Sequence, residues 1–180
     1  MTTPMNGHEP VIARRRFLGG TALAAILAVT GAAWWRSGGD AEAADAAPGK
    51  FEVEKTDAEW RKLLTPAQYD VLRNQGTERP FTSPLLDEHR KGTFSCAGCD
   101  LPLFASETKF DSGTGWPSFY QPLANAVGTT EDRSFMMVRV EVHCRRCGGH
   151  LGHVFDDGPP PTGKRYCMDG VALKFTPAAA

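Results

Sequence analysis

The stretches Cys96-Ala-Gly-Cys99 and Cys144-Arg-Arg-Cys147 constrain the fold of this sequence more than any others. Each has the C-x2-C spacing, in which both sulfurs can bind one metal ion. Two such pairs complete a tetrahedral set of four thiolates, the donor set that zinc prefers. The sequence therefore predicts a closed, structural four-cysteine zinc site that joins two distant segments of one domain.

Three other uses of these cysteines compete with that prediction. The pairs can form two redox disulfides, or they can bind iron in a rubredoxin-type site. A local set of Cys144, Cys147, His150 and His153 is the third option, but its H-x2-H spacing is shorter than usual. It also leaves the first cysteine pair without partners. We favour the four-cysteine zinc site, which leaves both histidines free for another role.

Outward from the cysteine pairs, the sequence consists mainly of short β-type runs. The alternation from Met137 onward suits a half-buried strand. Before these runs, Thr56-Asp-Ala-Glu59 and Thr65-Pro-Ala-Gln68 are typical of helix starts. A mainly antiparallel β domain with two short N-terminal helices is therefore predicted. The expected strands are Gly92–Cys96, Leu101–Phe104, Ser134–His143, His150–Phe155 and Arg165–Phe175.

The N-terminal part of the chain has the pattern of an export signal. Arg14, Arg15 and Arg16 precede a soft apolar stretch, residues 17–35, which is similar to a bacterial twin-arginine signal. We expect residues 1–43 to be a signal or anchor, 44–50 a disordered linker and 51–180 the folded domain. An uncleaved anchor through residues 17–35 is the alternative. In both cases the domain is expected outside the cytoplasm, in the bacterial periplasm.

Composition excludes several classes of protein. The 180 residues include 20 Lys+Arg and 21 Asp+Glu, so the formal net charge is −1. That balance gives no bulk attraction for nucleic acid, and a membrane partner is expected only if the signal stays uncleaved. Five cysteines are too few, and odd in number, for a disulfide scaffold.

Four zinc ligands leave Cys167 as the fifth cysteine. A lone cysteine is usually a small buried hydrophobe. Arg165, two residues away, shares its face if the segment is a strand, and it can then favour a thiolate. His150 and His153 can supply protons. Together these residues form a candidate site.

Three stretches make the sequence resemble the peptide methionine sulfoxide reductases of the B type. They are Gly113-Thr-Gly-Trp-Pro-Ser-Phe119, His150-Leu-Gly-His-Val-Phe-Asp-Asp-Gly-Pro159 and Arg165-Tyr-Cys-Met-Asp-Gly-Val-Ala-Leu-Lys-Phe175. Gly76-Thr-Glu-Arg-Pro-Phe81 and the two cysteine pairs fit as well. The resemblance implies two antiparallel sheets (a β-tent, or Mss4-like fold) and repair of oxidised proteins.

The resemblance also implies a role for each site residue. Cys167 would attack the sulfoxide sulfur and become a sulfenic acid, while His150 and His153 would hold water and protonate the departing oxygen. Trp116 and Phe119 would form the hydrophobic wall for the substrate methyl group, and Arg165 the cation near the thiol. The implied substrate is methionine-R-sulfoxide in peptides or proteins. The implied cofactor is one structural zinc ion on Cys96, Cys99, Cys144 and Cys147, with no organic cofactor.

Two positions depart from the family pattern. Thr114 stands where many relatives have a resolving cysteine, so we expect an external thiol, from a thioredoxin-like or other donor, to regenerate Cys167. Asp169 stands where asparagine is common. An ionised Asp169 would raise the pKa of Cys167; alternatively it orients a histidine or stays protonated as an acid.

Two other functions remain open from the residues alone. A non-catalytic zinc-ribbon module that binds a partner would explain the cysteine pairs. A thiol peroxidase would explain a reactive Cys167.

Overall fold

The computed structural model describes residues 51–179. The predicted export segment, residues 1–43, and the predicted linker, residues 44–50, lie outside the described residues. No helix in the described range has the length and apolar character needed to cross a membrane.

Both predicted helices are present, and both start at the predicted capping boxes. Helix α1 spans Asp57–Leu63 and helix α2 spans Pro66–Asn74. At the first start, the Thr56 hydroxyl accepts from the Glu59 backbone N–H, and the Glu59 carboxylate accepts from the Thr56 N–H at 2.8 Å. These contacts satisfy N–H groups that a helix leaves unpaired at its start.

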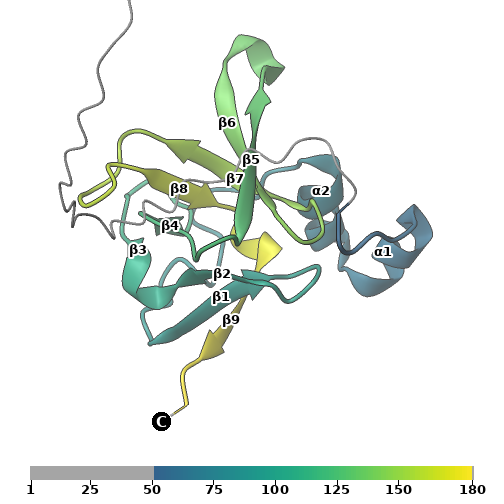
Figure 1. The fold of residues 1–180 in the computed structure, drawn as a ribbon, viewed down its shortest axis with the longest axis horizontal. Helices are drawn as coiled ribbons and strands as arrows, with labels where there is room; N and C mark the ends of the chain where they lie inside the picture. Colours follow the sequence, from purple (N-terminus) through teal and green to yellow (C-terminus); the bar gives the residue numbers. More distant parts are fainter. Residues whose placement is uncertain (1–50, 180) are drawn as a thin grey trace, which may run out of the picture. The chain divides into compact units, whose positions relative to one another are not determined.

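The remaining chain forms two antiparallel sheets, as predicted (Figure 1). The smaller sheet has the order β2-β1-β9, and the larger has the order β3-β4-β8-β7-β6-β5. The smaller sheet consists of β1 (Gly92–Cys96), β2 (Pro102–Ala105) and β9 (Leu173–Pro177). The larger consists of β3 (Lys109–Phe110), β4 (Ser118–Phe119), β5 (Val127–Asp132), β6 (Arg139–Cys144), β7 (His150–Phe155) and β8 (Arg165–Met168). Single 3-10 turns, η1 (Ser106–Thr108), η2 (Ser134–Met136) and η3 (Gly170–Ala172), lie between strands.

An aromatic cluster joins the two sheets. Phe94 on β1 and Phe104 on β2 are fully buried against Phe119 on β4. The rings of Phe104 and Phe119 are stacked, with centroids 4.3 Å apart, and Phe94 meets Phe119 edge-on at 5.0 Å. This packing fixes the position of β4, and therefore of the residues that follow Trp116.

Two predicted strands are wrong in extent. The run Arg165–Phe175 is not one strand: β8 belongs to the larger sheet and β9 to the smaller, and η3 carries the chain between them. The run Ser134–His143 begins with the turn η2, and β6 starts only at Arg139. Strands β3, β4 and β5 were not expected.

The start of β6 and the residue before it are also more exposed than the alternation predicts. Val138 is 69% exposed and Val140 is 41% exposed. The last pair between β6 and β7 is Val140 with Val154. Beyond that pair, β6 is bonded only to β5. In Figure 1 the β5–β6 hairpin extends beyond β7, so among residues 51–179 no second layer covers its end.

Candidate functional site

The four predicted zinc ligands come together at the ends of β1 and β6. All four Sγ atoms lie within 4.8 Å of one another. The Cys96 and Cys147 sulfurs are 3.7 Å apart, and the Cys99 and Cys144 sulfurs are 3.4 Å apart. A tetrahedral zinc ion with Zn–S bonds of about 2.3 Å needs S–S edges of about 3.8 Å. The geometry therefore fits a four-thiolate metal site.

The two cysteine pairs have the same local turn. The Asp100 N–H donates to the Cys96 carbonyl at 2.9 Å, and the Gly148 N–H donates to the Cys144 carbonyl at 2.8 Å. Asp100 and Gly148 both have positive φ, 58° and 67°. The repeated turn points both sulfurs of a pair at one place. The competing set of two cysteines and two histidines is not assembled, because both histidines hydrogen-bond carboxylates instead.

Cys167 lies between a histidine and a serine on one face of the larger sheet. On β8, its direct partners across the neighbouring strands are His153 on β7 and Ser118 on β4. Residues directly opposite one another in antiparallel strands have neighbouring side chains on the same face. The half-buried Cys167 thiol is therefore flanked by an imidazole and a hydroxyl.

A bulge in β7 brings the two histidines together. Residues three apart in a regular strand face opposite sides. In β7 the register with β6 shifts between the pairs Val142–Gly152 and His143–His150, so β7 holds one extra residue there. The His150 and His153 rings consequently meet, with centroids 5.4 Å apart. Gly152 has φ +146°, and a Cβ there would lie 2.1 Å from the Cys167 carbonyl oxygen. This approach requires glycine.

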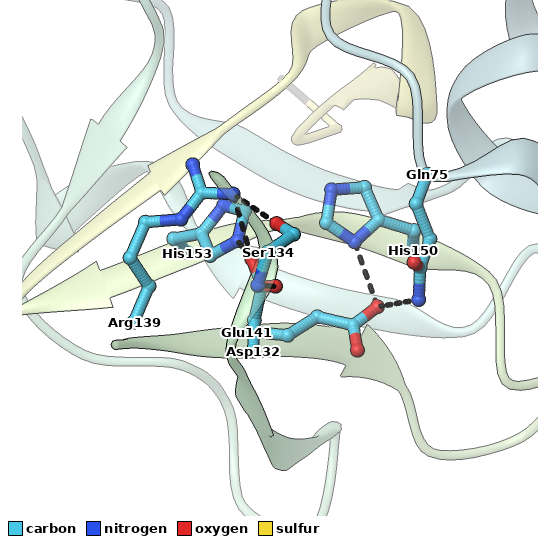
Figure 2. A network of polar contacts seen from close by, with 7 residues as sticks. All are labelled: Gln75, Asp132, Ser134, Arg139, Glu141, His150 and His153. Carbon is cyan, nitrogen blue, oxygen red and sulfur yellow. Dashed lines mark hydrogen bonds and ion pairs between the residues drawn. The ribbon is translucent and has the colours of Figure 1, made fainter. Parts of the chain in front are cut away.

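Each histidine is held by a carboxylate (Figure 2). His153 Nε2 lies 2.8 Å from Asp132 Oδ2, and His150 Nδ1 lies 2.7 Å from Glu141 Oε1. The carboxylate of Asp132 also accepts from Arg139 Nη2 at 2.6 Å and from the Ser134 N–H at 2.8 Å. A carboxylate that accepts several hydrogen bonds stays ionised.

Burial and these contacts set the protonation of the network. Hydrogen bonds from Ser134, and then from His153, hold the pKa of Asp132 below its usual range. The hydrogen bond with His150 lowers the pKa of Glu141. Burial lowers the pKa of His153, and the hydrogen bond with Asp132 opposes that effect. An ionised carboxylate can only accept hydrogen bonds, so Asp132 accepts from His153 Nε2 and Glu141 accepts from His150 Nδ1.

A pocket of about 600 Å³ opens over this network. Its lining includes His150, His153, Glu141 and Arg139. Cys167 is not among its lining residues. His153 borders the pocket and also pairs with Cys167 in the sheet, so it is the link between the two.

The buried His150 Nε2 has no hydrogen-bond partner among residues 51–179. A buried acceptor of this kind costs free energy unless water or a ligand satisfies it. His150 is therefore suited to hold a water molecule or a polar group of a substrate.

The surroundings of Cys167 act on its thiol in opposite directions. Burial raises the pKa of Cys167, whereas the Thr114 hydroxyl and the Arg165 guanidinium lower it. The negative charge of Asp169 raises it. Arg165 is the expected cation on the same face, and it forms a two-bond ion pair with Asp157, both contacts at 2.9 Å. Part of its charge is therefore already compensated.

Asp169 and Trp116 are both held by Glu78. The Glu78 backbone N–H donates to Asp169 Oδ1 at 2.9 Å, and Trp116 Nε1 donates to the Glu78 carbonyl at 3.2 Å. The Glu78 carboxylate in turn accepts from the backbone N–H groups of Gly170 and Val171. Asp169 is only 4% exposed, and burial raises its pKa to about 6. Its carboxyl group hydrogen-bonds the backbone and not a histidine.

Phe119 is not placed as the resemblance implies. Ser118 faces Cys167, so the next residue of the strand faces the opposite side, where it pairs with Tyr166. Phe119 is fully buried in the aromatic cluster between the sheets. Phe119 therefore lies in the core and not on the face that carries Cys167, whereas Trp116 is half-buried.

The sequence patterns did not identify the carboxylates behind the histidines. Arg139 and Glu141 are charged residues two apart on β6, so they lie on the same face of a half-buried strand. Their position on that strand was the only sequence feature that could have indicated a role in the site. Asp132 and Glu78 lie outside the expected strands and helices. Nothing in the sequence alone assigned their hydrogen bonds.

Comparisons with known proteins agree with this geometry. The family model described as the SelR domain matches residues 64–177. A peptide methionine sulfoxide reductase MsrB of Agrobacterium fabrum is 56% identical over 127 residues, which cover 70% of this chain and 94% of the relative. The protein of that name from Methanosarcina barkeri is 58% identical over 124 residues, 68% of this chain and 87% of the relative. The one from Pseudomonas putida is 58% identical over 127 residues, 70% of this chain and 96% of the relative. A family match over most of the chain, together with these identities, shows that the chain belongs to the SelR domain family.

Proposed function

We propose that this protein reduces methionine sulfoxide to methionine, with Cys167 as the nucleophile. The position of Cys167 carries the proposal: the thiol lies between His153 and Ser118 on one sheet face. The names of the curated relatives give the reaction. A buried thiol beside a histidine and a cation is also the arrangement that nucleophilic thiol catalysis needs.

The first half of the reaction transfers the sulfoxide oxygen to Cys167. The thiolate attacks the electrophilic sulfur of the sulfoxide and forms an S–S bond; the protonated oxygen then moves from the substrate sulfur to the Cys167 sulfur as the S–O and S–S bonds break, and methionine leaves. Cys167 becomes a sulfenic acid, so its sulfur is oxidised by two electrons while the substrate sulfur is reduced by two. No other oxidant or reductant is needed for this half.

The histidines deliver the proton that the sulfoxide oxygen requires. Because Asp132 accepts a hydrogen bond from His153 Nε2, the Nδ1 atom of His153 is the one that takes up and donates a proton. His150 Nε2 holds a water molecule or the oxygen-bearing group next to it. Protonation of the oxygen makes the sulfur more electrophilic and helps the S–O bond to break.

The half-buried Trp116 forms the wall against the substrate methyl group. Its indole N–H is already bonded to the Glu78 carbonyl, so the ring is held in place. A fixed apolar wall on one side and polar groups on the other would distinguish the two epimers at sulfur. We assign the R epimer, in peptides and proteins, from the resemblance to the B-type enzymes.

The second half requires thiols from outside the protein. Four of the five cysteines form the four-cysteine cluster, so none is left to resolve the sulfenic acid. Two external thiols reduce it: one forms a mixed disulfide and releases water, and the second restores the Cys167 thiol. Mass spectrometry after one turnover without reductant should show the sulfenic acid. An intramolecular disulfide, or release of zinc as a ligand reacts, would contradict this cycle.

Zinc is proposed to be structural. When bound, it would hold the end of β1 against the end of β6 through four thiolates, with no open position for a substrate. It supplies no step of the reaction.

One assay tests the proposed function against the alternatives. Purified protein and its Cys167→Ser variant are given a methionine-R-sulfoxide peptide, the S epimer or hydrogen peroxide, each with dithiothreitol. We expect reduction of the R epimer by the wild type alone. Activity that survives in the variant would refute the nucleophile, peroxide consumption alone would indicate a thiol peroxidase, and inactivity on all three would favour a binding module.

We further propose that residues 1–43 direct export of the domain. The support is the Arg14–Arg16 cluster and the soft apolar stretch behind it. Periplasmic activity that disappears in an Arg14→Lys, Arg15→Lys, Arg16→Lys variant would support this. An unchanged distribution would refute it.

A further inference from the structure

Three hydroxyl groups form a continuous chain that ends at the Cys167 thiol. The Ser118 and Ser112 oxygens are 2.7 Å apart, and Ser112 Oγ lies 2.8 Å from Thr114 Oγ1. Thr114 Oγ1 lies 3.8 Å from Cys167 Sγ, within reach for the larger sulfur atom. At the other end, the Ser118 hydroxyl donates to the Trp116 carbonyl at 3.1 Å.

Each hydroxyl has only one proton to donate, so the chain has a direction. With a neutral thiol, Cys167 donates to Thr114, Thr114 to Ser112, Ser112 to Ser118, and Ser118 to the Trp116 carbonyl. Every donor is then used. This direction is the one that the Ser118 contact with the carbonyl requires.

A thiolate cannot donate, and it needs a donor of its own. We propose that the chain reverses when Cys167 ionises, so that Thr114 donates to the thiolate, Ser112 to Thr114 and Ser118 to Ser112. This inference rests on the proposed function, since it concerns the nucleophile of that reaction. Thr114 is then a catalytic residue in contact with the reacting sulfur, and Ser112 and Ser118 are positioning residues.

The surroundings make such a donor necessary. The thiol is half-buried, so water cannot fully solvate its charge, and Arg165 is shared with Asp157. Burial raises the pKa of Cys167, and the hydrogen bond with Thr114 opposes that effect. Hydroxyls in series polarise one another, so a chain stabilises a charge more than an isolated hydroxyl does. Thr114 therefore has a function of its own at the position where many relatives have a resolving cysteine.

The first test measures how readily Cys167 is alkylated as a function of pH. Iodoacetamide labelling is followed by mass spectrometry of the Cys167 peptide in wild type, Thr114→Val and Thr114→Ser, with zinc content checked for each. Thr114→Val keeps the shape and removes the hydroxyl. We expect its apparent pKa to rise by about one unit, a roughly tenfold slower alkylation at pH 7. Thr114→Ser restores the donor and should match the wild type.

The second test observes the reversal itself. When Cys167 ionises, the Ser118 hydroxyl stops donating to the Trp116 carbonyl. The carbonyl 13C resonance of Trp116 should therefore titrate with the pKa of Cys167 that alkylation measures. In Ser112→Ala, which interrupts the chain, that titration should disappear. A merely structural role of Ser112 would leave it in place.

The outcomes separate clearly. A Thr114→Val profile that overlays the wild type, or a Thr114→Ser profile shifted as far as Thr114→Val, would overturn the proposal. A Trp116 carbonyl that does not titrate would also overturn it. If Thr114→Val does not fold, the carbonyl titration in wild type and Ser112→Ala decides alone. Neither test uses methionine sulfoxide, so a protein that fails to reduce the sulfoxide could still show both effects.

Discussion

Replacing Asp169 by asparagine should stabilise the protein above pH 6. The Asp169 carboxyl is 4% exposed, and burial raises its pKa to about 6 from the ordinary 3.8. The native state therefore binds this proton more tightly than the unfolded chain, and stability present below pH 3.8 is lost as the pH rises through 6. A difference of about two pKa units corresponds to about 3 kcal/mol. Asparagine removes the charge and keeps an oxygen for the Glu78 N–H.

Urea unfolding of wild type and Asp169→Asn, followed by tryptophan fluorescence from pH 4.5 to pH 8, measures this effect. The stability advantage of the variant should grow by about 2 kcal/mol over that range, because part of the loss lies below pH 4.5. Asp157→Asn is the control: Arg165 holds the pKa of Asp157 below its usual value, so the effect of this variant on stability should stay nearly constant from pH 4.5 to pH 8. An advantage of Asp169→Asn that does not change with pH would refute the reasoning.

The same variant should remain active. The substitution should lower the pKa of Cys167, because the negative charge of Asp169 raises that pKa in the wild type. The acid limb of the pH–rate profile should therefore move to lower pH. An unchanged profile would make Asp169 a bystander in the reaction.

Three further perturbations follow from the geometry. Removal of the metal by a chelator, or Cys99→Ser, should lower the midpoint of thermal unfolding strongly, because structural zinc in model peptides contributes about 10–16 kcal/mol; an unchanged midpoint would mean that no metal is bound. Asp132→Asn should lower the pKa of His153 further, since Asp132 opposes the effect of burial; NMR titration of the His153 ring measures it, and a rise would contradict the assignment. Phe119→Ala should lower the free energy of unfolding by about 3–5 kcal/mol with little change in KM of the folded enzyme. Trp116→Ala should raise KM. A higher KM for Phe119→Ala would indicate that Phe119 contacts the substrate after all.

Local sequence signals predicted the elements that depend on neighbouring residues. The capping boxes at Thr56 and Thr65 predicted both helices, because their hydrogen bonds join residues three apart. The extended runs predicted β1 and β7 with the bounds that the structure shows. The alternation did not predict the exposure of Val138, just before β6, or of Val140 within it, because exposure there depends on where the neighbouring strand ends.

The sequence by itself determined the chemistry available to this protein: four thiolates in two C-x2-C pairs, one further cysteine with a cation two residues away, and two histidines upstream. Those properties follow from residue type and short spacing. Only the tertiary structure decided which groups meet. The bulge in β7 turns His150 toward the same side as His153, against the alternation of a regular strand. The pairing of β4 with β8 places Ser118 beside Cys167 and sends Phe119 into the core. Register depends on contacts between segments far apart in the chain, so a shift of one residue, invisible in the sequence, exchanges the two faces of a strand.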